Sequence, residues 1–245
     1  MIIALFALVG LFFGSFLNVC ILRIPEGKDI VRLPSSCPLC GKRLRWHELI
    51  PVVSYAAQRG KCKGCKGKVS AQYPLIELTN AALWVLAYLA SGLDAHTGLL
   101  CLLGSALLAV AMIDARTGEI PPGINIAIAA LGAASLALDY PNWPEYVIGA
   151  GAVSLPLLAV WFATKGRGIG GGDIKLMAAC GLALGWRLLL LGFFAGCVLG
   201  TVIHIARMVF GRAGRSLAFG PYLAAGVFAS ALWGRALMSW YLSLF

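Results

Sequence analysis

Long apolar stretches alternate with short polar segments along almost the whole chain. Eight apolar runs reach about 17 residues or more, the length that a helix needs to cross a lipid bilayer. They cover about residues 1–21, 74–91, 98–114, 123–139, 145–163, 174–190, 188–206 and 218–243. Only residues 185–187 interrupt the sixth and seventh runs, so a count of seven is the alternative. The pattern predicts an all-α membrane protein with about eight transmembrane helices.

One longer polar stretch lies between the first and second apolar runs. We therefore expect three parts: a first transmembrane helix over residues 1–22, a polar insert over 23–73 and a transmembrane bundle over 74–245. We expect the first run to remain in the protein as a helix, because no basic residue precedes it and no small-residue cleavage site leads into a soluble domain.

The composition supports a membrane protein. Of the 245 residues, 60% are hydrophobic and 12% are charged, and the mean hydropathy is +0.86. A soluble domain carries about 25% charged residues. This deficit of charge, together with the long apolar runs, argues against one large soluble core.

The net charge of +10 could suggest a nucleic-acid partner, but its distribution indicates membrane topology instead. Eleven of the 20 Lys and Arg residues lie between Arg23 and Lys68, within the insert. If the insert is cytoplasmic and eight helices alternate in direction, only Arg187 and Arg235 fall outside, as the positive-inside rule requires. The other basic residues expected on the cytoplasmic side are Arg116, Lys165, Arg167, Lys175, Arg207, Arg212 and Arg215. We expect contacts with membrane lipids and no nucleic-acid partner.

Small residues recur within the apolar runs. Gly192, Gly196 and Gly200 have the GxxxG spacing that lets two helix backbones approach closely inside a membrane. This spacing predicts tight helix packing in the last third of the chain. Four isolated cysteines in the runs are expected to be small buried hydrophobic residues: Cys20, Cys101, Cys180 and Cys197.

Four cysteines of the insert form two C-x2-C pairs. Cys37 and Cys40 make the first pair, Cys62 and Cys65 make the second, and 21 residues separate Cys40 from Cys62. Four thiolates in this arrangement can bind Zn²⁺ tetrahedrally, with no open position for catalysis. We therefore expect structural zinc that folds the insert. Two disulfides or a redox function are the alternatives, although a cytoplasmic loop is kept reduced.

Two aspartates stand out because acidic residues are scarce, with only 10 Asp and Glu in the chain. Asp114 ends the third apolar run and Asp173 begins the sixth, 59 residues later. An ionisable residue at membrane depth costs about 2.5–3.5 kcal/mol on insertion scales, so it is a functional candidate. The predicted topology places both residues at the cytoplasmic ends of helices, where they can meet.

Two neighbouring carboxyl groups can share one proton, so that one acts as a base towards water and the other as an acid towards a peptide carbonyl. Gly170, Gly171 and Gly172 precede Asp173 and carry no side chains, which would let a peptide backbone approach. A purely structural interpretation remains open: each aspartate could cap a helix or pair with Arg116 or Lys175.

At these residues the chain resembles the bacterial prepilin peptidases, or type IV leader peptidases, of the GxGD aspartic protease group. Gly170-Gly171-Gly172-Asp173 matches the GxGD element and is followed by Lys175-Leu176, and Asp114 resembles the first catalytic aspartate. Pro122 departs from the family, which usually has Asp after the proline of the first motif. Further matches, in order, are Gly14-Ser-Phe-Leu-Asn18-Val, Ile50-Pro-Val-Val-Ser-Tyr55, Arg59-Gly-Lys-Cys62, Tyr73-Pro-Leu-Ile-Glu77-Leu and Phe219-Gly-Pro221-Tyr-Leu.

The resemblance implies an enzyme of the bacterial inner membrane with its active site facing the cytoplasm. It would remove the basic leader of type IV prepilins and type II secretion pseudopilins, after a glycine. Members with the four-cysteine insert typically also methylate the new N-terminus with S-adenosylmethionine. Among the residues near the insert, Glu77 is the candidate for a function in that second reaction.

Two other functions compete with this one. A proton- or ion-coupled transporter would use intramembrane aspartates, but it predicts inverted repeats that the sequence does not show. A membrane-anchored zinc module that recruits partners would leave the glycines before Asp173 unexplained. The segment 166–171 also matches G-x-G-x-x-G, but a membrane helix precedes it and no βαβ unit can follow, so it does not locate S-adenosylmethionine.

Overall fold

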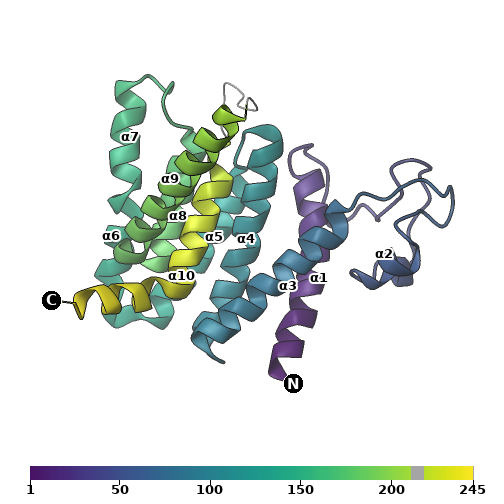
Figure 1. Cartoon of the computed structure of the whole chain (residues 1–245), viewed down its shortest axis with the longest axis horizontal. Helices are drawn as coiled ribbons and strands as arrows, with labels where there is room; N and C mark the ends of the chain where they lie inside the picture. The colour runs from purple at the N-terminus through teal and green to yellow at the C-terminus, as the bar shows by residue number, and fades with distance from the viewer. Residues whose placement is uncertain (211–217, 245) are drawn as a thin grey trace. The chain divides into compact units, whose positions relative to one another are not determined.

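The computed structural model describes residues 1–210 and 218–244, and within them the fold is helical (Figure 1). Two isolated β-bridges, Ser36–Arg43 and Lys61–Lys68, are the only extended pairings found among those residues. The predicted all-α class is confirmed. Arg212 and Arg215, which the topology argument used, lie outside the described residues.

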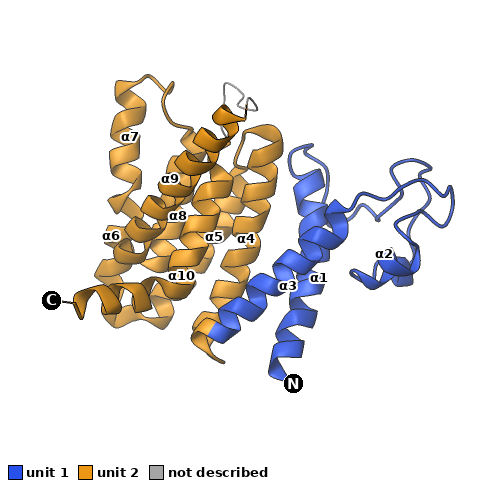
Figure 2. Ribbon diagram, in the orientation of Figure 1, with its two compact units in different colours: residues 1–89 blue, residues 90–245 orange. Residues whose placement is uncertain are grey.

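The chain forms two compact units, Met1–Leu89 and Ala90–Phe245 (Figure 2). We call them unit 1 and unit 2 and describe each by itself. Unit 1 contains α1 (Ile2–Arg23), η1 (Trp46–Glu48), α2 (Val53–Ala57) and nearly all of α3 (Gln72–Ser91). Unit 2 contains α4 (Ala95–Thr117), α5 (Pro122–Leu138), η2 (Tyr140–Asn142), α6 (Trp143–Ala152), α7 (Ser154–Ala163), α8 (Gly171–Leu184), α9 (Trp186–Val209) and α10 (Gly220–Leu242).

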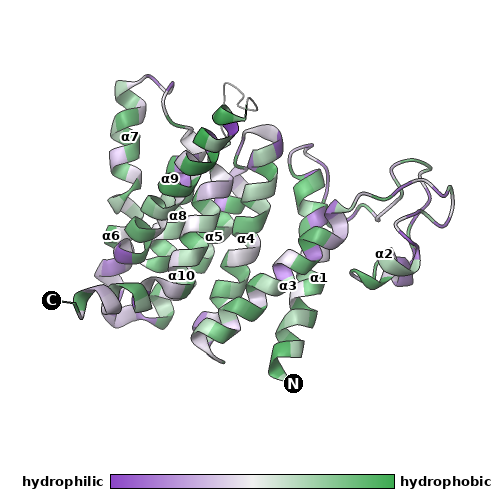
Figure 3. Cartoon of the chain, viewed as in Figure 1, coloured by the Kyte–Doolittle hydropathy of each residue, from purple (hydrophilic) through white to green (hydrophobic). Residues whose placement is uncertain are grey.

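Each predicted apolar run is occupied by helix. Among the described residues, five helical segments are long and apolar enough to cross a membrane, and α5 is a shorter apolar helix. The five are α1, α3, α4, the segment Tyr140–Ala163 and α9. Helices α8 and α10 fill the two remaining runs. Hydrophobic residues dominate the helices, whereas hydrophilic residues gather in the connections (Figure 3).

The sixth and seventh runs are separate helices that meet at Gly185. Helix α8 ends at Leu184 and α9 begins at Trp186, so one residue makes the turn. Gly185 has φ +80°, a conformation that a residue with a Cβ rarely adopts. The structure thus favours the count of eight runs over the count of seven.

The run expected over residues 145–163 is not one continuous helix. It is divided at Val153 into α6 and α7. Pro156 explains the break, because a proline within a helix has no N–H for the carbonyl four residues earlier, here that of Ala152. The hydroxyl of Ser154 donates a hydrogen bond to the carbonyl of Ala150 beside the break.

Glycines bring the helices of unit 2 together, as the GxxxG spacing predicts. A Cβ placed on Gly192 would lie 2.8 Å from Cα of Val227, and one on Gly196 would lie 3.0 Å from the carbonyl oxygen of Tyr222. Helices α9 and α10 therefore pack backbone to backbone. Helices α6 and α8 meet in the same way where Gly149 contacts Gly181.

In unit 1, glycines and asparagines join α1 to α3. A Cβ on Gly14 would lie 2.7 Å from Cα of Glu77. The amide nitrogen of Asn80 donates to the carbonyl of Gly10 at 2.7 Å, and that of Asn18 donates to the carbonyl of Tyr73 at 3.1 Å. Both asparagines are buried. Polar groups inside this helix pair thus satisfy backbone carbonyls rather than face lipid.

Candidate functional site

Asp114 lies in the last turn of α4 and is buried, with 6% of its surface exposed. The helix ends at Thr117, because Gly118 adopts a left-handed conformation and donates its N–H to the Asp114 carbonyl. The backbone N–H of Gly220, the first residue of α10, donates to Oδ2 of Asp114 at 2.8 Å. The end of α4 therefore binds the backbone carbonyl of Asp114, and the start of α10 binds its carboxyl group.

Gly220 has to be a glycine for this contact to exist. A Cβ at this position would lie 2.7 Å from Oδ2 of Asp114, closer than real Cβ contacts come. Phe219-Gly-Pro221 is one of the motifs that carry the family resemblance. The glycine of this motif anchors the carboxyl group of Asp114, which lies 106 residues earlier in the chain.

Asp173 lies in the first turn of α8, after the extended residue Gly170, and is partly exposed. A Cβ on Gly170 would lie 3.0 Å from Oδ2 of Asp173, and one on Gly172 would lie 3.1 Å from Cβ of Ile120. A Cβ on Gly171 would meet nothing within 4 Å. The three glycines therefore differ: two permit close packing, and the middle one faces open space.

The structure brings the two aspartates together. Their carboxyl groups lie close enough to interact electrostatically. The contact between Ile120 and Gly172 joins the segment that follows Asp114 to the segment that precedes Asp173. Within the described residues, neither aspartate forms an ion pair with Arg116 or Lys175, both of which are exposed. The alternative that each aspartate serves only to form an ion pair with Arg116 or Lys175 therefore has no support.

Two carboxyl groups that interact electrostatically in this way can do acid–base chemistry once they come close. When they are close, the ionisation of one raises the cost of ionising the other, so the pair holds a single proton over a range of pH. The ionised member can then accept a proton from water while the protonated member donates one. This is the chemistry of aspartic proteolysis.

The four cysteines of the insert come together in unit 1. Their sulfur atoms all lie within 4.8 Å of one another, and Sγ of Cys37 lies 4.0 Å from Sγ of Cys65. Tetrahedral zinc with Zn–S distances of about 2.3 Å requires sulfurs about 3.8 Å apart. The four residues therefore fit Zn²⁺. No two of the described cysteines are joined in a disulfide.

The two C-x2-C pairs form matching turns, 25 residues apart. The N–H of Cys37 donates to the carbonyl of Lys42, and the N–H of Cys62 donates to the carbonyl of Gly67, each at 2.9 Å. The N–H of Gly64 lies 3.4 Å from Sγ of Cys62. Backbone N–H groups of Cys65 and Gly64 lower the pKa of the Cys62 thiol to about 6, which favours the thiolate that a metal binds.

Two buried glutamates brace this part of unit 1. Glu48 accepts hydrogen bonds from the N–H of Arg45 at 2.9 Å and from Nζ of Lys42 at 3.1 Å. These donors, the backbone N–H first, lower the pKa of Glu48. Glu77 accepts the N–H of Val52 at 2.7 Å, where the backbone has a positive φ of 59°. Each carboxylate thus fixes a turn of the insert.

The chain resembles known proteins over nearly its whole length. Residues 8–91 match the model of the bacterial peptidase A24 N-terminal domain, and residues 101–205 match that of the type IV leader peptidase family. The prepilin leader peptidase/N-methyltransferase of Bacillus subtilis is 36% identical over 238 residues, which is 96% of each chain.

Other similar proteins bear the same name. That of Pseudomonas putida is 33% identical over 95% of this chain and 91% of its own, and that of Pseudomonas aeruginosa is 32% identical over 96% and 91%. No solved structure matches the chain. The two family models divide the chain near the boundary between units 1 and 2.

Proposed function

Because the chain belongs to the type IV leader peptidase family, we propose that Asp114 and Asp173 are the catalytic pair with which it removes the leader of prepilins. The enzyme is an aspartic endopeptidase and an N-methyltransferase, since it matches the type IV leader peptidase family and its relatives are named prepilin leader peptidase/N-methyltransferase. The observation that carries the assignment of the pair is the approach of the two carboxyl groups at one site, with Asp114 anchored by Gly220.

In the proposed reaction, the ionised member of the pair takes a proton from a water molecule, whose oxygen attacks the scissile carbonyl carbon. The protonated member donates its proton to the carbonyl oxygen, so the tetrahedral intermediate is neutral and the pair still holds one proton. The amide nitrogen then takes a proton from the pair as the C–N bond breaks, and a hydroxyl group of the intermediate returns a proton to the pair as the new carboxyl group forms. Water is consumed, and the pair ends with the protons it began with.

The glycines before Asp173 fit a peptide substrate. Gly171 faces open space, so an extended backbone can approach Asp173 there without meeting a side chain. Lys175, exposed on the next turn of α8, is a second residue that we assign to this substrate-facing loop. Cleavage after a small residue would suit such a narrow approach. The substrates we propose are type IV prepilins and type II secretion pseudopilins.

The orientation of the site follows from charge. The basic residues of the insert favour the cytoplasmic side of the bacterial inner membrane, where both aspartates and the leader would then lie. Membrane lipids would surround the helices, and no nucleic-acid partner is needed to explain the charge.

We assign Zn²⁺ a structural function in unit 1, held by Cys37, Cys40, Cys62 and Cys65. Four thiolate ligands leave no open position, so the metal would fold the insert rather than activate a substrate. S-adenosylmethionine would supply the methyl group for the new N-terminus. A function of Glu77 in that transfer stays a prediction, because its carboxylate already accepts the N–H of Val52.

Cleavage of a prepilin peptide by the purified protein in detergent tests the pair. Asp114→Asn and Asp173→Asn should each lower kcat/KM by at least about 10³-fold, because Asn can neither take up nor donate the proton. Asp94→Asn is the matched control, since Asp94 only caps the other end of α4 and Asn caps a helix equally well.

Near-normal cleavage by either variant would refute the dyad. Cleavage in detergent, where no sealed membrane separates two compartments, also separates this function from ion-coupled transport. A transporter would show loss of uptake in vesicles and no peptide cleavage by the unaltered protein.

A further inference from the structure

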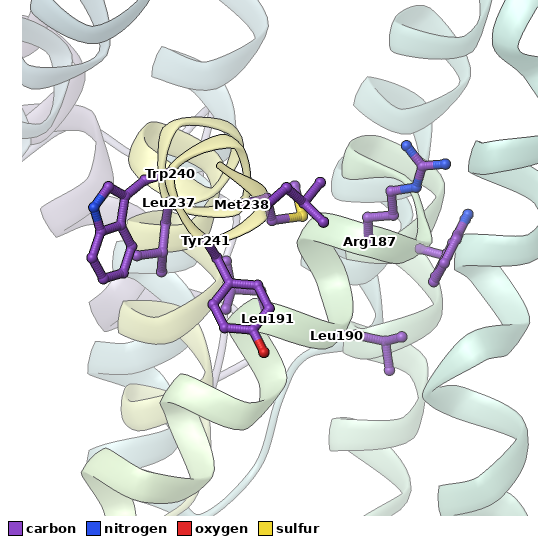
Figure 4. Close-up of a pocket in the computed structure, with 9 residues that line it drawn as sticks. Arg187, Leu190, Leu191, Leu237, Met238, Trp240 and Tyr241 are labelled. Carbon is purple, nitrogen blue, oxygen red and sulfur yellow. The ribbon is translucent and has the colours of Figure 1, made fainter. Parts of the chain in front are cut away.

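The end of unit 2 remote from the aspartate pair contains two adjoining cavities. One is polar, has a volume of about 520 Å³, and is lined by Asp139, Glu145, Arg187 and Arg235 among other residues. The other is apolar, about 510 Å³, and lies between α9 and α10 (Figure 4). Arg187 and Met238 line both. A molecule that occupies both cavities must therefore be charged at one end and apolar at the other.

The apolar cavity opens on a surface that would face lipid. Leu190 on α9 and Leu237 on α10 line it and are 41% and 48% exposed. Trp240 and Tyr241, at the rim in Figure 4, are more than half exposed. Aromatic residues at the end of a membrane helix mark the level of the lipid headgroups. Both cavities, which share Arg187 and Met238, thus lie near headgroup level, and the apolar one opens towards the acyl chains.

The polar cavity presents charges of both signs. Nη1 of Arg187 lies 3.5 Å from Oε1 of Glu145, whereas Arg235 forms no ion pair within 4.0 Å in the described part of the chain and interacts with Asp139 only at longer range. Asp139 accepts hydrogen bonds from Nδ2 of Asn142 and from the hydroxyl of Tyr146, each at 2.9 Å. These donors lower the pKa of Asp139, Asn142 contributing most, so that it is ionised at neutral pH.

We propose that the two cavities together bind a phospholipid whose headgroup carries a phosphate and a primary ammonium. Guanidinium groups bind phosphate oxygens through charge-assisted hydrogen bonds, and the guanidinium of Arg235 lines the polar cavity without a direct ion pair in the described part of the chain. The ammonium would donate its three N–H groups to Asp139 and Glu145. The adjoining groove between Leu190 and Leu237 would take an acyl chain. An acidic lipid without the ammonium would leave the carboxylates facing its phosphate.

Native mass spectrometry of the delipidated full chain tests this binding site. Phosphatidylethanolamine, phosphatidylcholine and phosphatidylglycerol with the same acyl chains are added in turn to the protein in detergent. We expect phosphatidylethanolamine to bind about tenfold more tightly than phosphatidylcholine, whose trimethylated nitrogen cannot donate hydrogen bonds to the carboxylates. This corresponds to about 1.4 kcal/mol.

Two substitutions locate the site. Arg235→Gln should weaken binding of phosphatidylethanolamine about tenfold, and Asp139→Asn should abolish the preference over phosphatidylcholine. Arg207→Gln, at the other end of α9, is the control that should change neither. Because Asp139→Asn retains a hydrogen-bond acceptor for Asn142 and Tyr146, it remains informative if Arg235→Gln does not fold.

Three results would overturn the proposal. They are equal affinity for the ethanolamine and choline lipids, tighter binding of phosphatidylglycerol than of phosphatidylethanolamine, and unchanged lipid binding by folded Arg235→Gln. Displacement of the lipid by the apolar segment of a prepilin peptide, with no lipid preference remaining, would instead assign the cavities to the protein substrate. None of these measurements depends on the assignment of Asp114 and Asp173.

Discussion

The insert of unit 1 and the bundle of unit 2 are stabilised in opposite ways. Between residues 24 and 71, only Cys37, Glu48, Pro51 and Cys62 are buried, and two of these four are thiols. In α8, by contrast, seven of 14 residues are buried. The insert has almost no hydrophobic core, so we propose that it depends on zinc bound by its four cysteines. The bundle depends on close contact between helix backbones.

This difference means that the two regions should fail under different perturbations. A metal that binds only the folded insert stabilises it through the binding free energy, so removal of the metal removes most of that stability. The bundle contains no comparable cluster among its described residues. It should resist chelation and respond instead to small changes of side-chain volume at its glycines.

The largest effect is expected when the cluster is destroyed. Cys37→Ser combined with Cys62→Ser removes the two buried ligands, and structural zinc sites of this kind contribute about 10–16 kcal/mol. Bound zinc, measured by elemental analysis, should fall to zero and the insert should unfold. Peptide cleavage should persist, and methylation should be lost.

Cys101→Ser with Cys197→Ser provides the control, since those thiols lie outside the cluster. Loss of cleavage together with zinc would mean that the insert and the bundle do not fail separately, and the comparison would be wrong.

The next largest effect is expected at the anchor of Asp114. Gly220→Ala places a Cβ 2.7 Å from Oδ2, so the carboxyl group must shift. A misplacement of about 1 Å in a catalytic group costs roughly 10²-fold in rate. Peptidase kinetics should show this loss in kcat, with zinc content unchanged. Gly123→Ala, where a Cβ meets nothing within 4 Å, should retain full activity.

A smaller effect is expected at the contact of α6 with α8. Gly181→Ala would press a Cβ against the backbone of Gly149, and overpacking of this kind costs about 1–3 kcal/mol. Thermal unfolding should shift downwards, with and without chelator. Gly98→Ala is the helical control with open space around it, and it should be neutral or slightly stabilising. Equal melting temperatures of the two variants would contradict the packing argument.

The smallest effect is expected at Glu77. Glu77→Gln retains an acceptor for the N–H of Val52 but removes the charge, which lowers the strength of the hydrogen bond by about 1 kcal/mol. Hydrogen exchange at Val52 should accelerate about fivefold, and zinc content should not change. A large loss of methylation without faster exchange would support a direct function of Glu77 in the transfer.

Much of the fold could be predicted from the sequence because bilayer thickness imposes the lengths of the apolar runs. The break at Val153 was not predicted, since Pro156 lies inside a stretch that stays apolar throughout. The boundary at Gly185 stayed ambiguous for the same reason, because hydropathy does not register a single turn residue.

The site was predicted only in part. Each C-x2-C pair is a short sequence motif, so the cysteine cluster could be predicted directly from the sequence. The GxGD run and the scarcity of acids drew attention to both aspartates. The bond between Gly220 and Asp114 spans 106 residues, however, and glycine carries no side chain that could signal a contact. The division at 22 and 73, and the catalytic assignment of the residues, stay predictions.

The hydrogen bond from Asn18 to Tyr73 affects how the insert could change during evolution. Its side chain links the end of α1 to the carbonyl of Tyr73 at the start of α3, so both ends of the insert are tied together by the helix pair itself. A loop whose ends are already joined adds little entropy cost when it lengthens. The insert is therefore a position where chain can be gained, lost or exchanged during evolution while the helices that frame it stay paired.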